Sequence, residues 1–147
     1  MARPTVSAAV YSAQRGGGIH KWVNEKTTSG SEQVLTDATL YHNLAAGEVV
    51  MIGCMCYNVE TVSKDCSFEM ASCDAVAGGG TPTALTGKVV IYTGGTKNEF
   101  SSQERKFTPP IRVAYADGVR SISMQVKGND DATVISCGWQ GYTELLM

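Results

Sequence analysis

The chain has 147 residues, enough for one domain with a substantial hydrophobic core. Its net charge of −2 excludes a domain that binds polyanions through an overall positive charge. Charged residues make up only 18% of the chain, below the usual quarter, so much of the surface must be neutral. Such a surface is typical either of a low-charge monomer or of a subunit that other subunits cover.

Residues 1–18 are predicted to form a flexible N-terminal arm, and residues 19–147 a single domain. Pro4 and the three glycines at 16–18 disfavour regular structure. The first 24 residues contain three bases and no acid, whereas the remainder contains nine bases and 14 acids. Fully extended, the arm would reach about 60 Å, so we expect it to lie across a neighbouring subunit. Ordinary disorder of a chain terminus is the alternative.

Strands are predicted through the middle of the chain, separated by polar loops. The strand candidates are residues 19–23, 33–44 (two strands and a bend, with one helix as the alternative), 49–60, 67–73 and 88–93. The predicted loops are residues 24–31, 74–87 and 94–106. The last two loops are long enough to be functional, and we expect intermolecular contacts there.

Residues 107–144 predict three further strands separated by turns at 117–118 and 128–131. In the middle strand Ile122, Met124 and Val126 alternate with polar residues, which indicates one buried and one solvated face. An antiparallel sheet with one buried face needs a second layer. We therefore predict an all-β fold, a two-layer antiparallel β-sandwich of jelly-roll-like topology with about eight strands.

The sequence shows no pattern typical of catalysis or of metal binding. His20 and His42 lack the spacing of a metal-binding pair. The five cysteines are odd in number, and Cys54 and Cys56 share one face of a predicted strand, which suits neither a zinc knuckle nor a disulfide. No serine lies in a GxSxG turn, and no glycine run precedes a helical pattern. We therefore expect free thiols, no catalytic, cofactor or metal site, and no enzymatic activity.

Aromatic residues are the remaining functional candidates. Trp139 shares a strand face with Ile135 and Cys137, which places it in the core or in a subunit contact. Trp22 is less constrained. No apolar run approaches the roughly 20 residues of a membrane span, and residues 1–18 lack the apolar stretch of a secretory signal. We therefore expect synthesis in a cytosol and no membrane partner.

The arm, the FTPPI segment at 107–111 and the closing GWQGYTE at 138–144 resemble small jelly-roll virion structural proteins of the bacteriophage head-decoration or minor capsid type. The resemblance implies a non-enzymatic capsid decoration or cement protein, located in the virion after assembly in the host cytoplasm. It implies a homo-oligomer, with a trimer favoured, that binds other virion or capsid proteins; nucleic acid is not an expected partner. The interface candidates are Arg3, Arg15, Trp22, Phe100 and Arg105. The alternative is a carbohydrate- or ligand-binding β-sandwich module that uses exposed aromatic side chains.

Overall fold

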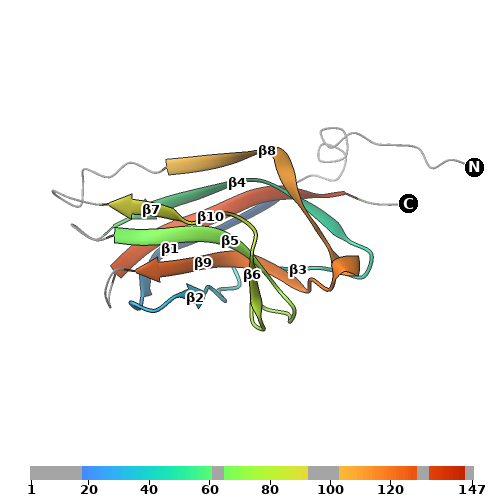
Figure 1. Ribbon diagram of the computed structural model, residues 1–147, viewed down its shortest axis with the longest axis horizontal. Coiled ribbons are helices and arrows are strands. Elements are labelled where there is room, and N and C mark those ends of the chain that lie inside the picture. The colour runs from blue at the N-terminus through green and yellow to red at the C-terminus, as the bar shows by residue number, and fades with distance from the viewer. Residues whose placement is uncertain (1–17, 61–64, 93–102, 129–132, 145–147) are drawn as a thin grey trace, which may run out of the picture.

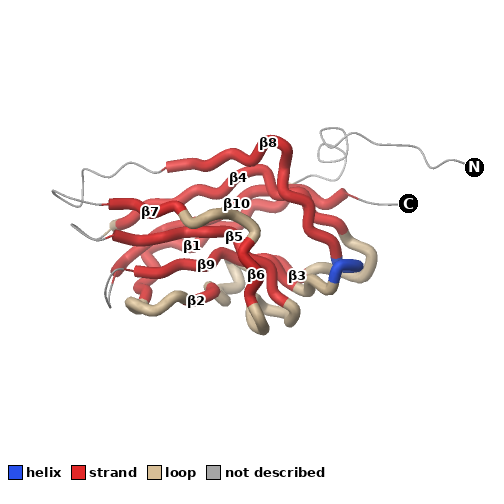
Figure 2. Tube along the Cα trace, in the orientation of Figure 1, coloured by secondary structure: helices blue, strands red, loops and turns tan. Residues whose placement is uncertain are grey.

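The computed structural model describes residues 18–60, 65–92, 103–128 and 133–144, which form two antiparallel sheets packed face to face (Figure 1). Strands make up most of this part of the chain (Figure 2). They are β1 (Ile19–Thr28), β2 (Gln33–Val34), β3 (His42–Asn43), β4 (Val49–Val59), β5 (Asp65–Cys73), β6 (Pro82–Ala84), β7 (Val89–Tyr92), β8 (Gln103–Ala114), β9 (Ser121–Gly128) and β10 (Thr133–Glu144), with a short 3-10 turn, η2 (Tyr115–Asp117), after β8. No helix in the described ranges has the length and apolarity that a membrane crossing requires.

The strand order confirms the predicted fold class. The four-stranded sheet has the order β1-β10-β4-β8, and the six-stranded sheet has the order β2-β9-β5-β6. Strands β2 and β3 both pair with the same edge of β9, and β6 and β7 both pair with the far edge of β5. The ten described strands therefore fill eight positions, four in each layer, which is the arrangement of a jelly roll.

The core lies between the two sheets. Ile122, Met124 and Val126 of β9 are fully buried there, as predicted, and face Ile135 and Trp139 of β10. The pattern thus identified correctly which side of β9 is apolar.

The opposite side of β9 is solvated only in its second half, which corrects the sequence interpretation in part. Lys127 is exposed and Gln125 half-buried, as predicted, whereas Ser121 and Ser123 are fully buried because loop segments fold over them. Ser121 Oγ donates a hydrogen bond to the Ala75 carbonyl at 2.7 Å and accepts one from the Gly78 N–H at 3.1 Å, and Ser123 Oγ donates to the Leu35 carbonyl. Small hydroxyls therefore satisfy loop backbone rather than water.

Three predicted loops contain strand. Strand β1 continues through residues 24–28 beyond an irregularity in its pairing between Val23 and Lys26, where Glu25 has a φ of 50°. This bulge breaks the alternation on which the prediction depended. The exposed three-residue β6 lies in the predicted loop 74–87, and β8 begins within the predicted loop 94–106.

Strand β8 forms one edge of the four-stranded sheet and bends sharply along its length (Figure 1). Ile52 pairs with Ile111, whereas Cys54 pairs with Lys106, so a single β4 residue faces the four β8 residues 107–110. Two of these four are prolines, which lack an N–H and so protect an edge from pairing with another strand. The bend opens a space beside β4.

Candidate functional site

The candidate site is the side of the four-stranded sheet that faces away from the core, here called the outer face. Cross-strand partners point to the same side of a sheet, so the buried pair Trp139 and Met55 places the neighbouring pair Gln140 and Cys54 on the outer face. By the same register, the outer face carries His20, Trp22, Met51, Cys54, Cys56, Asn58, Ser136, Gly138, Gln140 and Tyr142.

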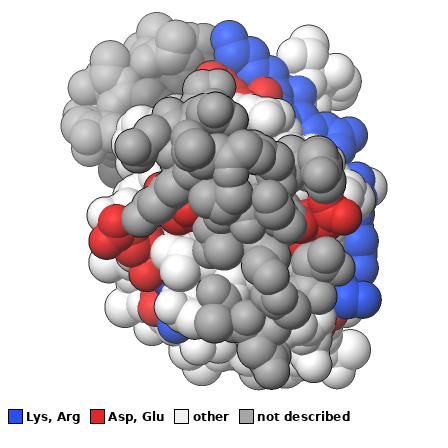
Figure 3. All heavy atoms as spheres, turned by 90° about the vertical axis from the view of Figure 1, so that its left-hand side faces the viewer, with Lys and Arg blue, Asp and Glu red and all other residues white. Residues whose placement is uncertain are grey.

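The middle of the outer face carries no charged side chain. Strand β4 has no Asp, Glu, Lys or Arg, and β10 has none before Glu144. Charges lie around this middle: at the β8 margin Glu104 pairs with Cys56 and Lys106 pairs with Cys54. Just beyond the end of β4 the Glu60 carboxylate accepts hydrogen bonds from Asn58 Nδ2 at 2.8 Å and Ser136 Oγ at 3.3 Å. Elsewhere charge is plentiful: seen from one end of the sandwich, Lys and Arg side chains gather along one margin, and Asp and Glu lie on both sides (Figure 3).

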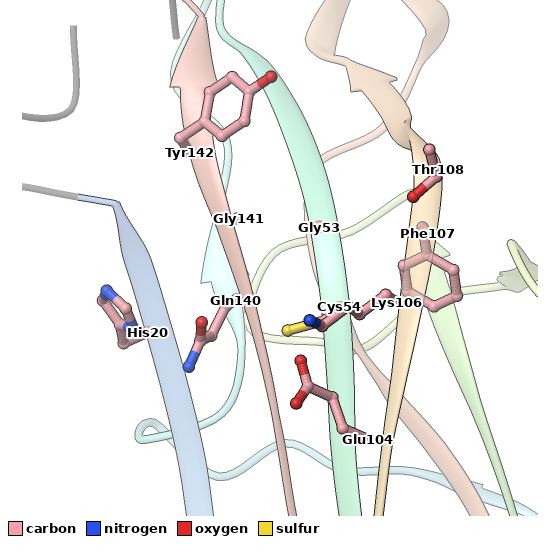
Figure 4. A pocket seen from close by; sticks show the side chains of 10 residues that line it. All are labelled: His20, Gly53, Cys54, Glu104, Lys106, Phe107, Thr108, Gln140, Gly141 and Tyr142. Carbon is pink, nitrogen blue, oxygen red and sulfur yellow. The ribbon is translucent and has the colours of Figure 1, made fainter. Parts of the chain in front are cut away.

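The outer face contains a hollow of about 340 Å³, here called the groove. All four strands of the sheet line it: His20 on β1; Gln140, Gly141 and Tyr142 on β10; Gly53 and Cys54 on β4; and Glu104, Lys106, Phe107 and Thr108 on β8. The Cys54 and Glu104 side chains point across the groove toward β10, and Tyr142 lies at one end of it (Figure 4).

Two glycines explain why the hollow exists. A Cβ on Gly141 would contact the Met51 carbonyl oxygen and lie 3.3 Å from Ile52 Cα, so the pairing irregularity at this point requires glycine. Gly53, at the corresponding irregularity of β4, also contributes no side chain. With the bend of β8 alongside, the floor of the groove is largely backbone.

The groove is not suited to thiolate chemistry. Burial, with contributions from Cys56 and Glu104, raises the pKa of Cys54 to about 11. Burial and the Glu104 carboxylate also raise the pKa of Cys56. A nucleophilic cysteine needs the opposite shift, so both thiols stay protonated near neutral pH. The groove therefore offers hydrogen-bonding groups and aromatic rings rather than a reactive centre.

Trp22 lies on the outer face beside the groove. It pairs with Gly138, and a Cβ on that glycine would lie 2.7 Å from Trp22 Cε3, so the indole covers Gly138. The side chain is nevertheless exposed, at 42% for the residue. From Gly138 to Gly141 is three residues along β10, or about 10 Å. Trp22 and the groove are thus neighbours on one surface.

Of the other predicted interface candidates, the structure describes only Arg105. It is exposed, its Nη1 donates to the Gly87 carbonyl at 3.1 Å, and its guanidinium carbon lies 5.9 Å from the Phe107 ring centre. Arg105 and Trp22 therefore lie at opposite edges of the four-stranded sheet and do not meet. Arg3, Arg15 and Phe100 lie outside the described residues.

A second polar cluster at the end of the sandwich has a structural role. The Glu48 carboxylate accepts hydrogen bonds from Thr143 Oγ1 at 2.6 Å and the Ala45 N–H at 2.9 Å, and lies 3.0 Å from His42 Nε2. Burial alone would raise the pKa of Glu48, but these hydrogen bonds and the His42 charge outweigh it and lower the pKa below 4.5. The carboxylate links the segment around β3 to the end of β10.

Among the described residues no group of three or more His, Cys, Asp or Glu side chains is placed to hold a metal ion. All five cysteines are free thiols. Sequence reasoning did not find the groove, although glycines at 53 and 141 within apolar strands signal a bulge or a close backbone approach.

No protein-family model matches the chain, and no curated protein matches its sequence. The fold is similar to a chain in the structure of infectious bursal disease virus Gx strain, with a TM-score of 0.49 and 10% identity, over 87% of this chain and 32% of that one. It is also similar to a chain in the crystal structure of the T13 infectious bursal disease virus particle, with a TM-score of 0.49 and 9% identity, over 87% and 31%. The chain therefore spans about a third of the length of these two chains.

Proposed function

We propose that this protein is a non-enzymatic structural subunit of a virion, of the capsid decoration or cement type, as the sequence resemblance implies. The observation that carries the proposal is the neutral outer face. The centres of protein interfaces are depleted in charged residues and enriched in aromatic residues and methionine. The two central strands of the outer face carry no charge before Glu144, at the end of β10, and the face presents Trp22, Tyr142 and Met51.

The size of the outer face suits a weak contact that is repeated many times. Eleven residues of β4 span about 36 Å, and three to four strands span about 14–19 Å, so the face covers roughly 500–700 Å². A stable interface uses about 800 Å² per partner. A single contact would therefore be weak, and symmetry-related copies on a capsid would supply the avidity. We propose a homo-oligomer, with a trimer favoured, bound to other capsid proteins.

The N-terminal arm belongs to the same proposal. A Cβ on Gly18 would lie 2.7 Å from the Gly141 carbonyl oxygen, so the chain enters β1 at the rim of the groove. From this point residues 1–17 have the length to reach a neighbouring subunit, and Arg3 and Arg15 provide charges for an acidic partner surface.

A charge placed on the outer face tests the proposal. Gln140 is exposed at the centre of the face, and Gln140→Lys should dissociate the oligomer, whereas Thr83→Lys on exposed β6 of the other sheet should not. Multi-angle light scattering across a concentration series measures the mass of each variant. A wild-type chain that stays monomeric at every concentration would contradict the proposal. Mass spectrometry of purified particles tests the virion location.

The groove supports a second candidate function, a carbohydrate- or ligand-binding module. Jelly rolls include lectin domains as well as capsid domains. The groove combines the rings of Tyr142 and Phe107 with hydrogen-bonding groups of Gln140, Glu104 and Thr108, the mixture typical of small-molecule sites. A glycan array discriminates between the two functions: strong binding by the wild type that Tyr142→Ala abolishes would favour this second function.

A further inference from the structure

We propose that, in the assembled protein, Trp22 of one copy covers the groove of a second copy. The inference rests on the proposed function, because it names the partner of the outer face. It commits to a second copy of this chain, rather than the arm or a soluble ligand, for three reasons that follow.

The first reason is position. Trp22 and the groove lie on the same face, about 10 Å apart along β10, and neither overlaps the other. A two-fold axis that lies in the plane of the interface, perpendicular to the line joining the two features and midway between them, would bring each Trp22 onto the groove of the partner. Such a surface is self-complementary, as a symmetric contact requires.

The second reason is chemistry. One side of the Trp22 ring rests on Gly138, and the residue remains 42% exposed. The groove offers rings at Tyr142 and Phe107 and a floor of backbone and protonated thiol. A buried indole N–H needs an acceptor.

The acceptor is present in the groove. The Glu104 carboxylate points into it, and the Gln140 side chain also lines it (Figure 4). The groove volume of about 340 Å³ lies at the lower end of the range for ligand pockets, roughly 300–1,000 Å³, which suits one aromatic side chain better than an extended polymer.

The third reason is area. Two faces of roughly 500–700 Å² would bury about 1,000–1,400 Å² in total, which clears the roughly 1,000 Å² that a specific interface needs but stays below the standard size of about 1,600 Å². Such a contact depends on a few central anchors, among which tryptophan in a desolvated pocket is enriched. Trp22 is the only exposed tryptophan among the described residues, since Trp139 is buried in the core.

Tryptophan fluorescence tests the inference directly. The chain has two tryptophans, and Trp139 is buried already, so a change in emission on assembly reports Trp22. With rising protein concentration the wild type should show a blue shift and protection from acrylamide quenching, in step with the increase in mass. Trp22→Ala should weaken association at least tenfold, whereas Thr27→Ala, an exposed residue of the same strand and face, should not.

A variant of the groove itself provides the second test. A Cβ on Gly53 meets nothing closer than the Gln140 carbonyl oxygen, at 3.8 Å, so Gly53→Leu should fill the groove without disturbing the fold. Circular dichroism checks that the variant folds. Gly53→Leu should weaken association as much as Trp22→Ala does, and the double variant should show little further loss, because both remove one contact.

Several results would overturn the inference. If the oligomer forms while Trp22 stays open to the quencher, or if Trp22→Ala associates normally, the outer face works without this contact and the proposed function survives alone. If the wild type never associates, both this inference and the proposed function are wrong. If deletion of residues 1–17 abolishes the protection of Trp22, the arm occupies the groove instead. If an added oligosaccharide protects Trp22 in the monomer, a glycan occupies the groove instead of a second copy.

Discussion

Replacement of Trp139 separates two contributions to the core: burial of an aromatic ring and one hydrogen bond. Trp139 is 1% exposed, and its Nε1–H donates to the Leu40 carbonyl at 2.8 Å. Leu40 itself is fully buried, in the segment between β2 and β3. The ring also meets His42 edge to face, with centroids 6.5 Å apart. Trp139 thus connects the four-stranded sheet to the segment that packs beside it.

The two contributions have different magnitudes. Trp139→Phe keeps most of the apolar burial but leaves the Leu40 carbonyl without this donor, which costs about 1–3 kcal/mol. Trp139→Ala also removes the ring and leaves a cavity, for a total of about 4–8 kcal/mol. A domain of this length has a stability of roughly 7–15 kcal/mol, so the alanine variant should lose about half of its stability.

Urea unfolding followed by far-ultraviolet circular dichroism gives both free energies. We expect the stability order wild type, Trp139→Phe, Trp139→Ala with an unchanged m-value. Trp22→Ala, measured at concentrations where the protein is monomeric, is the matched control and should cost about 1 kcal/mol or less. A phenylalanine variant as stable as the wild type would refute the role of the hydrogen bond. An alanine loss below about 1 kcal/mol would refute the core position.

Three further changes probe other contacts. Glu48→Gln should lower stability by about 1–3 kcal/mol at pH 7; because the folded pKa of Glu48 lies below 4.5, the difference should persist above about pH 4.5 and disappear as the pH falls through that lowered pKa in acid unfolding curves. Cys56 is the one cysteine that is not buried, so a thiol reagent should modify it first, and peptide mapping that finds another cysteine labelled earlier would contradict its placement. Gly138→Ala should destabilise the β1 edge by about 1–3 kcal/mol, because a Cβ there would strike the Lys21 carbonyl oxygen, whereas Gly53→Ala should be neutral; equal melting temperatures would contradict this difference.

The sequence predicted the layers of the fold because burial follows alternation. Phe68 and Met70 lie on the core side of β5, and the apolar residues of β9 do the same, so period-2 patterning located the core. The pattern failed where the backbone departs from regular pairing, as at Glu25 in β1. It also failed at Ser121 and Ser123, because polarity alone does not show whether a hydroxyl meets water or a covering loop.

The groove lies beyond what a sequence pattern can show. His20, Cys54, Glu104 and Gln140 come from four strands far apart in the chain, and only strand order and register bring them to one surface. Trp22 could be singled out as unconstrained, but its position over Gly138 depends on the pairing of β1 with β10. Arg105, chosen by residue type, donates a hydrogen bond to the Gly87 carbonyl of its own chain, and its place in an interface stays a prediction.

The two central strands of each sheet distinguish the two explanations for the low overall charge. If neutrality were a general property of the chain, both sheets would share it. In the six-stranded sheet, β5 and β9 carry Asp65, Glu69 and Lys127 on the side away from the core, and Lys88 pairs with Glu32 nearby. The central strands of the four-stranded sheet carry no charge before Glu144. Charge is therefore absent from the centre of one particular face and confined to its margins, and a neutral centre with an exposed tryptophan beside it favours a partner over solvent.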